Sequence, residues 1–345
     1  MRLGILTGGG DCPGLNAVIR AVVTRAVRTY DGHVLGIEDG WLGLLQNRLR
    51  ELDLNAIAGI LPRGGTILGT SRVDPFREPP GPGGIRETMA LHELDGLLVC
   101  GGDGTLAAAH RLAEDGLPII GIPKTIDNDV PGTDFAFGFD TAVNTVMHAV
   151  DALHTTAEAH NRVIVLEVMG RGTGWIAVCG GIAGGADVVV SPEEPVSIDD
   201  VCRLIGHRHA RGRDFSIVVV AEGATFRPDA EGRTVEATHR LDPFGRPQYG
   251  GIGEVVAREI QTRTGFETRT VALGYVQRGG TPTAFDRLLG SRMGVMAVDL
   301  AAREEWNRMT SLQGGRVTSV DLGVVREGAR RVEKELNEVA RVFFG

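Results

Sequence analysis

Residues 96–105, which read GLLVCGGDGT, join an apolar run to a glycine-rich loop and decide the fold. A short apolar run that ends in glycine is typical of a buried strand, and apolar side chains recur at helical spacing after Thr105. The same order is found at 3–6 (LGIL), before the glycines of 8–10, and at 163–169 (VIVLEVM), before GRGTG. Strands this apolar, each followed by a glycine loop and a helix, predict a parallel sheet covered by helices on both faces.

The rest of the chain continues this alternation of strands and helices. The run PIIGI at 118–122 is another apolar strand, and it precedes the polar loop PKTIDND. The segment 225–250 is a polar excursion with little periodicity. Later strands are expected at 187–190, 216–220 and 270–276, and helices near 139–157, 198–209, 283–303 and 328–342.

Size and composition indicate a globular protein with one large or two medium-sized domains. The chain has 345 residues, of which 42% are hydrophobic and 23% charged. Its formal net charge of −8 argues against a general nucleic-acid or membrane-surface binder. The four cysteines form no C-x-x-C pair, so neither zinc nor a disulfide framework is indicated. Because no apolar run has membrane-spanning length and the N-terminus lacks a signal-peptide pattern, we expect a cytoplasmic protein.

Two glycine loops are candidates for binding phosphate. Backbone N–H groups of a glycine loop at a helix start favour an anion, as in the segment 8–10, although a turn made only for packing explains that motif alone equally well. The loop 101–105 also carries Asp103, and a carboxylate in this position can hold Mg²⁺ beside bound phosphates. The alternative is that Asp103 merely caps the helix that follows.

The loop 123–129 places two carboxylates, a hydroxyl and one of the only two lysines directly after an apolar strand. Either Asp127 or Asp129 could act as a base for a sugar hydroxyl. The alternative is a turn capped by Asp and Asn side chains. Four arginines lie at other strand ends or in loops, alongside Glu222 and Tyr275; they are Arg162, Arg171, Arg269 and Arg278. The arginine fork is well shaped for phosphate, although a single arginine is more often a surface residue.

Taken in order, the motifs resemble those of the 6-phosphofructokinases over nearly the whole chain. The matching stretches are GGGDCPGLNAVIR, GGDGTL, PKTIDNDV, FGFDTA, EVMGRGTGW, AEGA and LGYVQRGGTPTAFDRLLGSRMG. The resemblance implies an α/β fold with two similar Rossmann-like, doubly wound domains and largely parallel sheets. It places the phosphoryl donor on residues 1–138 plus about 277–327, and fructose 6-phosphate on residues 139–276 plus about 328–345.

The resemblance also implies a role for individual residues. Asp127 would be the general base that takes the proton from the 1-hydroxyl of the sugar, and Thr125 would lie beside the transferred group. The donor, ATP, would bind with Mg²⁺ on Asp103, at a site formed by Gly10, Arg72, Val73, Gly102, Asp103, Gly104 and Thr105. The sugar phosphate would contact Met169, Gly170, Arg171, Glu222, Tyr275 and Arg278. Arg162 and Arg269 resemble arginines that reach this site from a neighbouring subunit, which implies a homodimer or homotetramer.

The chain departs from the family pattern in three ways. Tyr275 stands where many relatives have histidine, and Thr24 and His154 replace arginines of the effector site of allosteric relatives. At the donor site, an Asp at position 104 would fill the space that a nucleotide needs, while a Lys at 124 accompanies pyrophosphate use. This chain combines Gly104 with Lys124. We favour ATP, because the missing side chain at 104 leaves room for the nucleotide.

Three alternatives stand beside the ATP-dependent reaction. The first is a pyrophosphate-dependent fructose 6-phosphate 1-phosphotransferase. The second is another GGDGT kinase, of the NAD or lipid kinase type, which would explain residues 101–105 but none of the later motifs. The third is a sugar-phosphate sensor without catalysis, and the presence of both Asp103 and Asp127 argues against it.

Overall fold

The structure is a computed structural model that describes residues 1–237, 240–241 and 247–344. The chain forms two compact units, the first made of Met1–Thr141 with Arg278–Ala329 and the second of Ala142–Gln277 with the segment from Arg330 onward. The sequence places the domain boundaries near residues 138, 277 and 327, and the ligand assigned to each domain stays a prediction. Among the helices of the described residues, none combines the length and hydropathy needed to cross a bilayer.

The first unit is built on an eight-stranded sheet with the strand order β16-β15-β5-β4-β1-β2-β3, with β6 paired to the end of β5. Its central strands are parallel and almost completely buried, as their apolar sequences predict. The two edge strands, β3 and β16, run antiparallel to their neighbours. The strands are β1 (Arg2–Thr7), β2 (His33–Ile37), β3 (Leu49–Glu51), β4 (Gly96–Gly101), β5 (Ile119–Thr125), β6 (Phe137–Gly138), β15 (Arg308–Gln313) and β16 (Arg316–Asp321).

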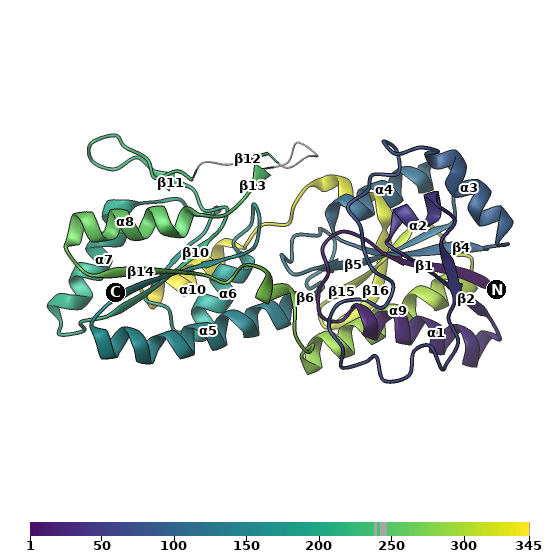
Figure 1. Cartoon of the computed structure of the whole chain (residues 1–345), viewed down its shortest axis with the longest axis horizontal. Helices are drawn as coiled ribbons and strands as arrows, with labels where there is room; N and C mark the ends of the chain where they lie inside the picture. The colour runs from purple at the N-terminus through teal and green to yellow at the C-terminus, as the bar shows by residue number, and fades with distance from the viewer. Residues whose placement is uncertain (238–239, 242–246, 345) are drawn as a thin grey trace. The chain divides into compact units, whose positions relative to one another are not determined.

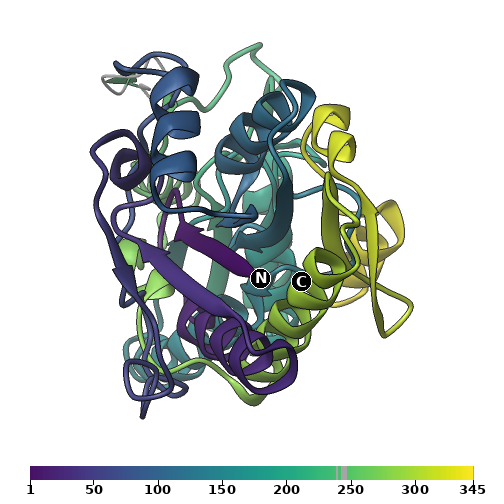
Figure 2. The ribbon, with the colours of Figure 1, turned by 90° about the vertical axis from the view of Figure 1, so that its right-hand side faces the viewer.

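Helices cover both faces of this sheet (Figure 2). On one face, α1 (Leu15–Tyr30) and α9 (Ala284–Ala302) lie side by side. Their close approach depends on Gly294, where a Cβ would lie only 2.9 Å from the carbonyl oxygen of Val18. The other face is covered by α2 (Trp41–Leu45), α3 (Pro82–Leu91) and α4 (Asp103–Glu114), whose apolar side chains share one core cluster with β1, β4 and β5. The short 3₁₀ helix η2 (Leu322–Glu327) follows β16.

The second unit has a four-stranded, fully parallel sheet with the order β14-β7-β10-β8. In Figure 1, α5 (Phe139–His160) and α6 (Trp175–Gly184) cover one face, and α7 (Ile198–Ala210) and α8 (Ile252–Thr264) cover the other. The valines of the strands pack against apolar residues of α7 and α8. The strands are β7 (Val163–Val168), β8 (Val188–Val190), β10 (Ser216–Ala221) and β14 (Thr268–Ala272).

Short elements complete the second unit. The 3₁₀ helix η1 (Gly274–Arg278) follows β14, and α10 (Lys334–Val342) packs against α6. Two small ladders pair β9 (Val196–Ser197) with β11 (Phe226–Arg227), and β12 (Arg240–Leu241) with β13 (Pro247–Gln248).

The predicted fold class, α/β with doubly wound and largely parallel sheets, is confirmed. Several details differ from the expectations. Neither β2 nor the antiparallel hairpin of β15 and β16 was expected from the sequence. The strand expected at 270–276 is β14 over Thr268–Ala272 followed by η1, and the helix expected from 328 begins only at Lys334.

Both sheets contain a point where the direction of the strand order reverses. In the first unit, the chain leaves β1 toward β2 on one side and leaves β4 toward β5 on the other. In the second unit, it leaves β7 toward β8 and leaves β10 toward β14. In open α/β sheets, ligands bind at the carboxyl ends of the strands that flank such a point. We therefore expect ligands to bind at the loops after β1, β4, β7 and β10.

Candidate active site

Three loops of the first unit lie next to one another because the strands before them are neighbours in the order β5-β4-β1. They are the glycine loop 8–10, the loop 101–105 and the polar loop 123–129. Gly8 N donates a hydrogen bond to the carbonyl oxygen of Cys100 over 2.9 Å, which joins the first two loops. The ammonium group of Lys124 donates to the carbonyl oxygen of Gly10, which joins the first loop to the third.

Thr105 explains why two of these positions are glycine. A Cβ at Gly8 would lie 2.7 Å from the Thr105 side chain, and one at Gly101 would lie 2.3 Å from it. Thr105 is only 8% exposed, so it fills the space between the two glycine loops. The packing explanation considered for the segment 8–10 is therefore real at Gly8. Because the amides of Gly8 and Gly9 donate to Cys100 and Ser71, the amide of Gly10 is the candidate for phosphate in this loop.

Asp103 does not cap the helix that it begins. The N-cap of α4 is Gly102, which has no side chain to bond the first backbone amides. Asp103 and Gly104 are both exposed. An exposed carboxylate at a helix start suits a divalent cation that is also bound by phosphate oxygens. The described residues contain no cluster of three or more His, Cys, Asp or Glu side chains that could hold a metal ion by themselves.

The polar loop after β5 is largely buried. Lys124, Thr125 and Asp127 are 3%, 8% and 5% exposed, and Asp127 N donates to Thr125 Oγ1 over 3.0 Å. Asn128 adopts a φ of 50°, and its side chain bonds the backbone of residues 134 and 136, so it stabilises the turn. Burial, together with the nearby Asp127 carboxylate, raises the pKa of Asp129 to about 6. The turn explanation therefore holds for Asn128, whereas the carboxyl of Asp129 has a pKa suited to proton chemistry near neutral pH.

Two cationic side chains lie against the Gly10–Asp11 backbone. Arg278 is 8% exposed and its Nη1 donates to the carbonyl oxygen of Asp11 over 3.3 Å. A Cβ at Gly10 would lie 2.4 Å from the same Nη1, so the guanidinium group occupies the space that a side chain at position 10 would need. Lys124 is the second cation, and burial lowers the pKa of its ammonium group. Arg278, expected to contact the sugar phosphate, thus belongs to the first unit and neighbours the donor loop.

The segment that carries Arg72 and Val73 pairs with the same glycine loop. Gly9 N donates to the carbonyl oxygen of Ser71 over 2.9 Å, and Thr70 Oγ1 donates to the carbonyl oxygen of Gly9 over 2.6 Å. Arg72 is exposed, whereas Val73 is half-buried and packs against the core. The structure thus brings the predicted donor residues Gly10, Arg72 and Val73 to one edge of the sheet.

In the second unit, Arg171 and Glu222 follow the neighbouring strands β7 and β10. Arg171 N donates to Glu222 Oε1 over 2.9 Å. The two loops touch so closely that a Cβ at Gly223 would lie 1.8 Å from the carbonyl oxygen of Arg171. Arg171 has a φ of 51°, which is uncommon for a residue other than glycine and is frequent at ligand sites. Gly170, with a φ of 143°, occupies a conformation that L side chains rarely adopt.

Met169 and Tyr275 belong to the same unit. Met169 N donates to the side-chain oxygen of Gln277 over 3.2 Å, and Gln277 Nε2 donates to the carbonyl oxygen of Gly274 over 3.0 Å. Gln277 is fully buried and so fixes η1 against the end of β7. Tyr275, on η1, is 76% exposed. Gln277 was not among the residues expected at the site, although it lies within the stretch LGYVQRGGTPTAFDRLLGSRMG.

Arg162 and Arg269 lie at the opposite end of the same sheet. Arg162 precedes β7 and Arg269 is the second residue of β14, so both lie near the amino ends of parallel strands. Both guanidinium groups pair with Glu267, at 2.8 Å and 2.6 Å, and these arginines lower the pKa of that carboxyl. Arg162 is six residues, or roughly 20 Å, from Val168 at the carboxyl end of β7. Arg269 pairs with Ile164, which is four residues, or roughly 13 Å, from the same end. Glu267 was not expected from the sequence, since no motif marks it.

Both units are doubly wound and carry glycine loops at the carboxyl ends of their strands, so the protein belongs to the doubly wound α/β class. A sequence model described as phosphofructokinase matches residues 2–301. ATP-dependent 6-phosphofructokinase 2 of Streptomyces coelicolor is 48% identical over 344 residues, which cover 99% of this chain and 100% of that protein. Pyrophosphate–fructose 6-phosphate 1-phosphotransferase of the same organism is 47% identical over 346 residues, covering 100% of both chains.

The solved structures show the same relationship. The crystal structure of Pichia pastoris phosphofructokinase in the T-state matches with a TM-score of 0.82 and 32% identity, over 99% of this chain. The match spans 36% of the Pichia chain, so the present chain corresponds to about a third of that longer one. The chain belongs to the phosphofructokinase family.

Proposed function

We propose that this chain is a 6-phosphofructokinase that transfers the γ-phosphoryl group of ATP to the 1-hydroxyl of fructose 6-phosphate, giving fructose 1,6-bisphosphate and ADP. The observation that carries the proposal is the strand order β5-β4-β1, which brings two glycine loops and the Asp127 loop to one edge of the sheet. Phosphoryl transfer needs positioning and charge neutralisation more than covalent chemistry, and these loops supply both. Full-length relatives named ATP-dependent 6-phosphofructokinase support it.

On the donor side, the backbone amides of Gly10, Gly102 and Gly104 face the phosphates, together with Thr105. Arg72 and Val73 lie beside the rest of the nucleotide. Asp103 would hold Mg²⁺, which neutralises charge on the phosphate oxygens when it is bound.

On the acceptor side, Asp127 takes the proton of the 1-hydroxyl, and Thr125 lies beside the transferred group. Burial keeps water away from both side chains. Arg278 and Arg171 bring positive charge to the sugar phosphate. Met169, Gly170, Glu222 and Tyr275 complete the contacts with the sugar phosphate.

We propose further that the protein works as a homodimer or homotetramer, in which Arg162 and Arg269 complete the site of a neighbouring subunit. Their position supports this, because Arg162 lies roughly 20 Å and Arg269 roughly 13 Å from the carboxyl end of β7, where Arg171 of their own chain follows. Mixing inactive Arg162→Ala and Arg171→Ala variants tests the idea. If the two arginines come from different subunits, hybrid oligomers contain some intact sites and activity reappears. Continued inactivity of the mixture, with hybrids shown to form, would contradict it.

Pyrophosphate is the second candidate for the phosphoryl donor. Lys124 and the relatives named for pyrophosphate favour pyrophosphate as the alternative donor. However, Lys124 has a function that does not depend on the donor, since its ammonium group joins β5 to the Gly10 loop. We therefore propose ATP. Family membership argues against the NAD or lipid kinase alternative, and the cytoplasmic location stays a prediction.

The assignment of the base is tested by comparing Asp127→Asn with Asp129→Asn. Loss of a general base typically costs 10²- to 10⁴-fold in rate, so Asp127→Asn is expected to lower kcat by about this factor and still bind fructose 6-phosphate in a calorimetric titration. Asp129→Asn is expected to lower kcat less. If Asp127→Asn turned over like the wild type, the base would be wrongly assigned and a sensor without catalysis would need reconsideration.

A further inference from the structure

A buried glutamine side chain connects two segments of the predicted sugar-phosphate site. Gln277 is the residue at which the chain leaves the second unit, and its side chain is fully buried. Its Oε1 accepts a hydrogen bond from Met169 N over 3.2 Å, and its Nε2 donates one to the carbonyl oxygen of Gly274 over 3.0 Å. Both ends of the carboxamide are therefore used in one bridge between the end of β7 and η1.

This bridge lies beyond the end of the sheet. The ladder between β14 and β7 ends with the pair of Ala272 and Glu167, after which Leu273 N donates to the carbonyl oxygen of Glu167 over 3.1 Å. At Gly274 the chain turns into η1 with a φ of 51°, a conformation that favours glycine. Gln277 therefore ties the chain to the end of β7 where the backbone ladder no longer does so.

The bridge also determines the direction in which Tyr275 points. In a 3₁₀ helix, residues three positions apart lie on the same face, so Gly274 and Gln277 share the face of η1 that is turned toward β7. Tyr275 and Val276 lie on the other faces, and they are 76% and 60% exposed. Because so exposed a ring has little packing of its own, its position depends on the buried side chain two residues later.

From this bridge we infer that Gln277 is a positioning residue for fructose 6-phosphate, and that it acts through Met169 and Tyr275. The inference rests on the proposed function, in which both of these residues contact the sugar phosphate. The carboxamide holds the Met169 backbone and η1 at one separation, so that the two contacts reach the ligand together. Without the carboxamide, the Met169 amide and the Gly274 carbonyl would lose these hydrogen bonds, and η1 could shift away from β7.

The test is a double-mutant cycle of Gln277→Met and Tyr275→Ala in steady-state assays of the full chain. Methionine has about the length of glutamine, cannot donate a hydrogen bond and is only a weak acceptor. Gln277→Met is expected to raise the KM for fructose 6-phosphate about tenfold, with kcat and the KM for the phosphoryl donor within about twofold of the wild type. In the Tyr275→Ala background, the same substitution is expected to raise this KM no more than about threefold, because the ring that Gln277 positions is then absent.

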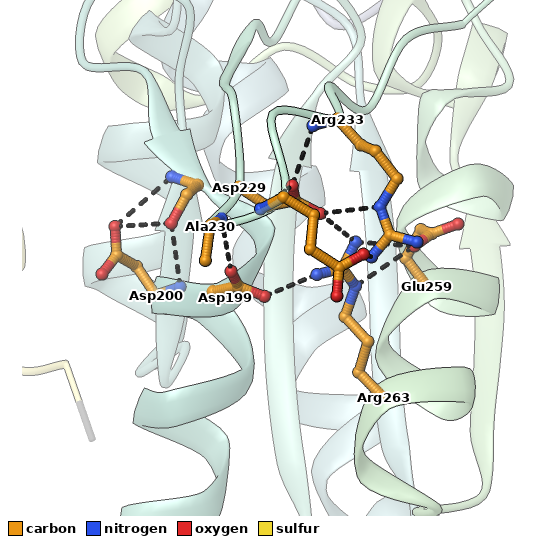
Figure 3. A network of polar contacts seen from close by, with 9 residues as sticks. Asp199, Asp200, Asp229, Ala230, Arg233, Glu259 and Arg263 are labelled. Carbon is orange, nitrogen blue, oxygen red and sulfur yellow. Dashed lines mark hydrogen bonds and ion pairs between the residues drawn. The ribbon is translucent and has the colours of Figure 1, made fainter.

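Arg263→Ala is the control for a general loss of stability, because it breaks an ion pair with a buried carboxylate in the same unit. Figure 3 shows Arg263 paired with the carboxylates of Asp199, Asp229 and Glu259. None of these residues is among those expected at the site. This variant is expected to melt at a lower temperature than the wild type and to keep the wild-type KM for fructose 6-phosphate.

Three results would overturn the inference: an unchanged KM for fructose 6-phosphate in Gln277→Met, an equal rise of this KM in both backgrounds, or a rise of the same size in Arg263→Ala. Should Gln277→Met fail to purify in a folded state, Gln277→Glu is measured in its place against the same outcomes, since an ionised carboxylate cannot donate to the Gly274 carbonyl. The wild type separates this inference from the proposed function. If it did not phosphorylate fructose 6-phosphate with either donor, the proposed function itself would fail.

Discussion

Replacing Gly223 by alanine adds one methyl group at the place where the Arg171 and Glu222 loops touch. The new Cβ would lie 1.8 Å from the carbonyl oxygen of Arg171, whereas real Cβ contacts below 3.0 Å are essentially absent. The two loops must therefore separate by about 1.2 Å. The hydrogen bond from Arg171 N to Glu222, now 2.9 Å long, would then exceed the normal range.

A misplacement of about 1 Å at a reacting site can cost 100-fold in rate. Gly223→Ala is therefore expected to lower kcat/KM for fructose 6-phosphate about 100-fold, which corresponds to about 2.7 kcal/mol. The assay follows product formation over a range of sugar phosphate at saturating donor, and then over a range of donor. The KM for the donor should stay within about twofold, because the donor residues belong to the other unit.

Gly206→Ala is the matched control for this substitution. Gly206 lies inside α7 in the same unit, and a Cβ there would meet no atom within 4 Å. Alanine is the better helix former, so the free energy of unfolding of this variant should be about 1 kcal/mol higher than that of the wild type. The variant should keep full activity. The reasoning would be refuted if Gly223→Ala, shown to be folded by thermal unfolding, kept the wild-type KM and kcat for fructose 6-phosphate.

Three further predictions concern the metal, the ion pair of Arg263 with Asp229, and the pH dependence of stability. Asp103→Asn should raise the Mg²⁺ concentration for half-maximal activity and leave the melting temperature unchanged; an unchanged Mg²⁺ requirement would remove Asp103 as a ligand. Arg263→Ala should lower the melting temperature much more than Arg227→Ala, because Arg263 pairs with Asp229, whose side chain is fully buried, whereas Arg227 pairs with the half-buried Asp200; equal effects would contradict this reasoning. Burial raises the pKa of Asp286 to about 6, so its contribution to stability is present below pH 4 and is lost as the pH rises to 6. Between pH 5.0 and pH 7.5, the free energy of unfolding measured with urea should fall less for Asp286→Asn than for the wild type. Equal falls would refute the raised pKa of Asp286 as the cause.

Most of the parallel core could be predicted because β1, β4 and β7 are apolar runs followed by glycine loops, and β5, β8 and β10 also contain apolar runs. The antiparallel hairpin of β15 and β16 could not, since β16 is only half-buried along its length and gives no comparable run. The late start of α10 has a tertiary cause. Arg330 stacks on the ring of Trp175 and its carbonyl oxygen accepts from the indole nitrogen, and these contacts hold residues before Lys334 out of the helix.

The candidate site shows the same division between local and distant information. The loops that carry Asp103, Asp127 and Arg171 follow from local sequence, because in each sheet the parallel strands bring their carboxyl ends to one edge. The contact of Lys124 with Gly10 joins residues more than 100 positions apart, and no spacing rule indicates it. Glu267, which pairs with both interface arginines proposed here, is invisible for the same reason. Its role depends on strand pairing.

The donor comparison tests the central claim most directly. Purified wild-type protein is supplied with fructose 6-phosphate and Mg²⁺, and formation of fructose 1,6-bisphosphate is followed in a coupled assay with either ATP or pyrophosphate as the only donor. We predict turnover with ATP and none with pyrophosphate, because Gly104 leaves room for the nucleotide and Lys124 is engaged with the Gly10 loop. Comparable or faster turnover with pyrophosphate would contradict the claim.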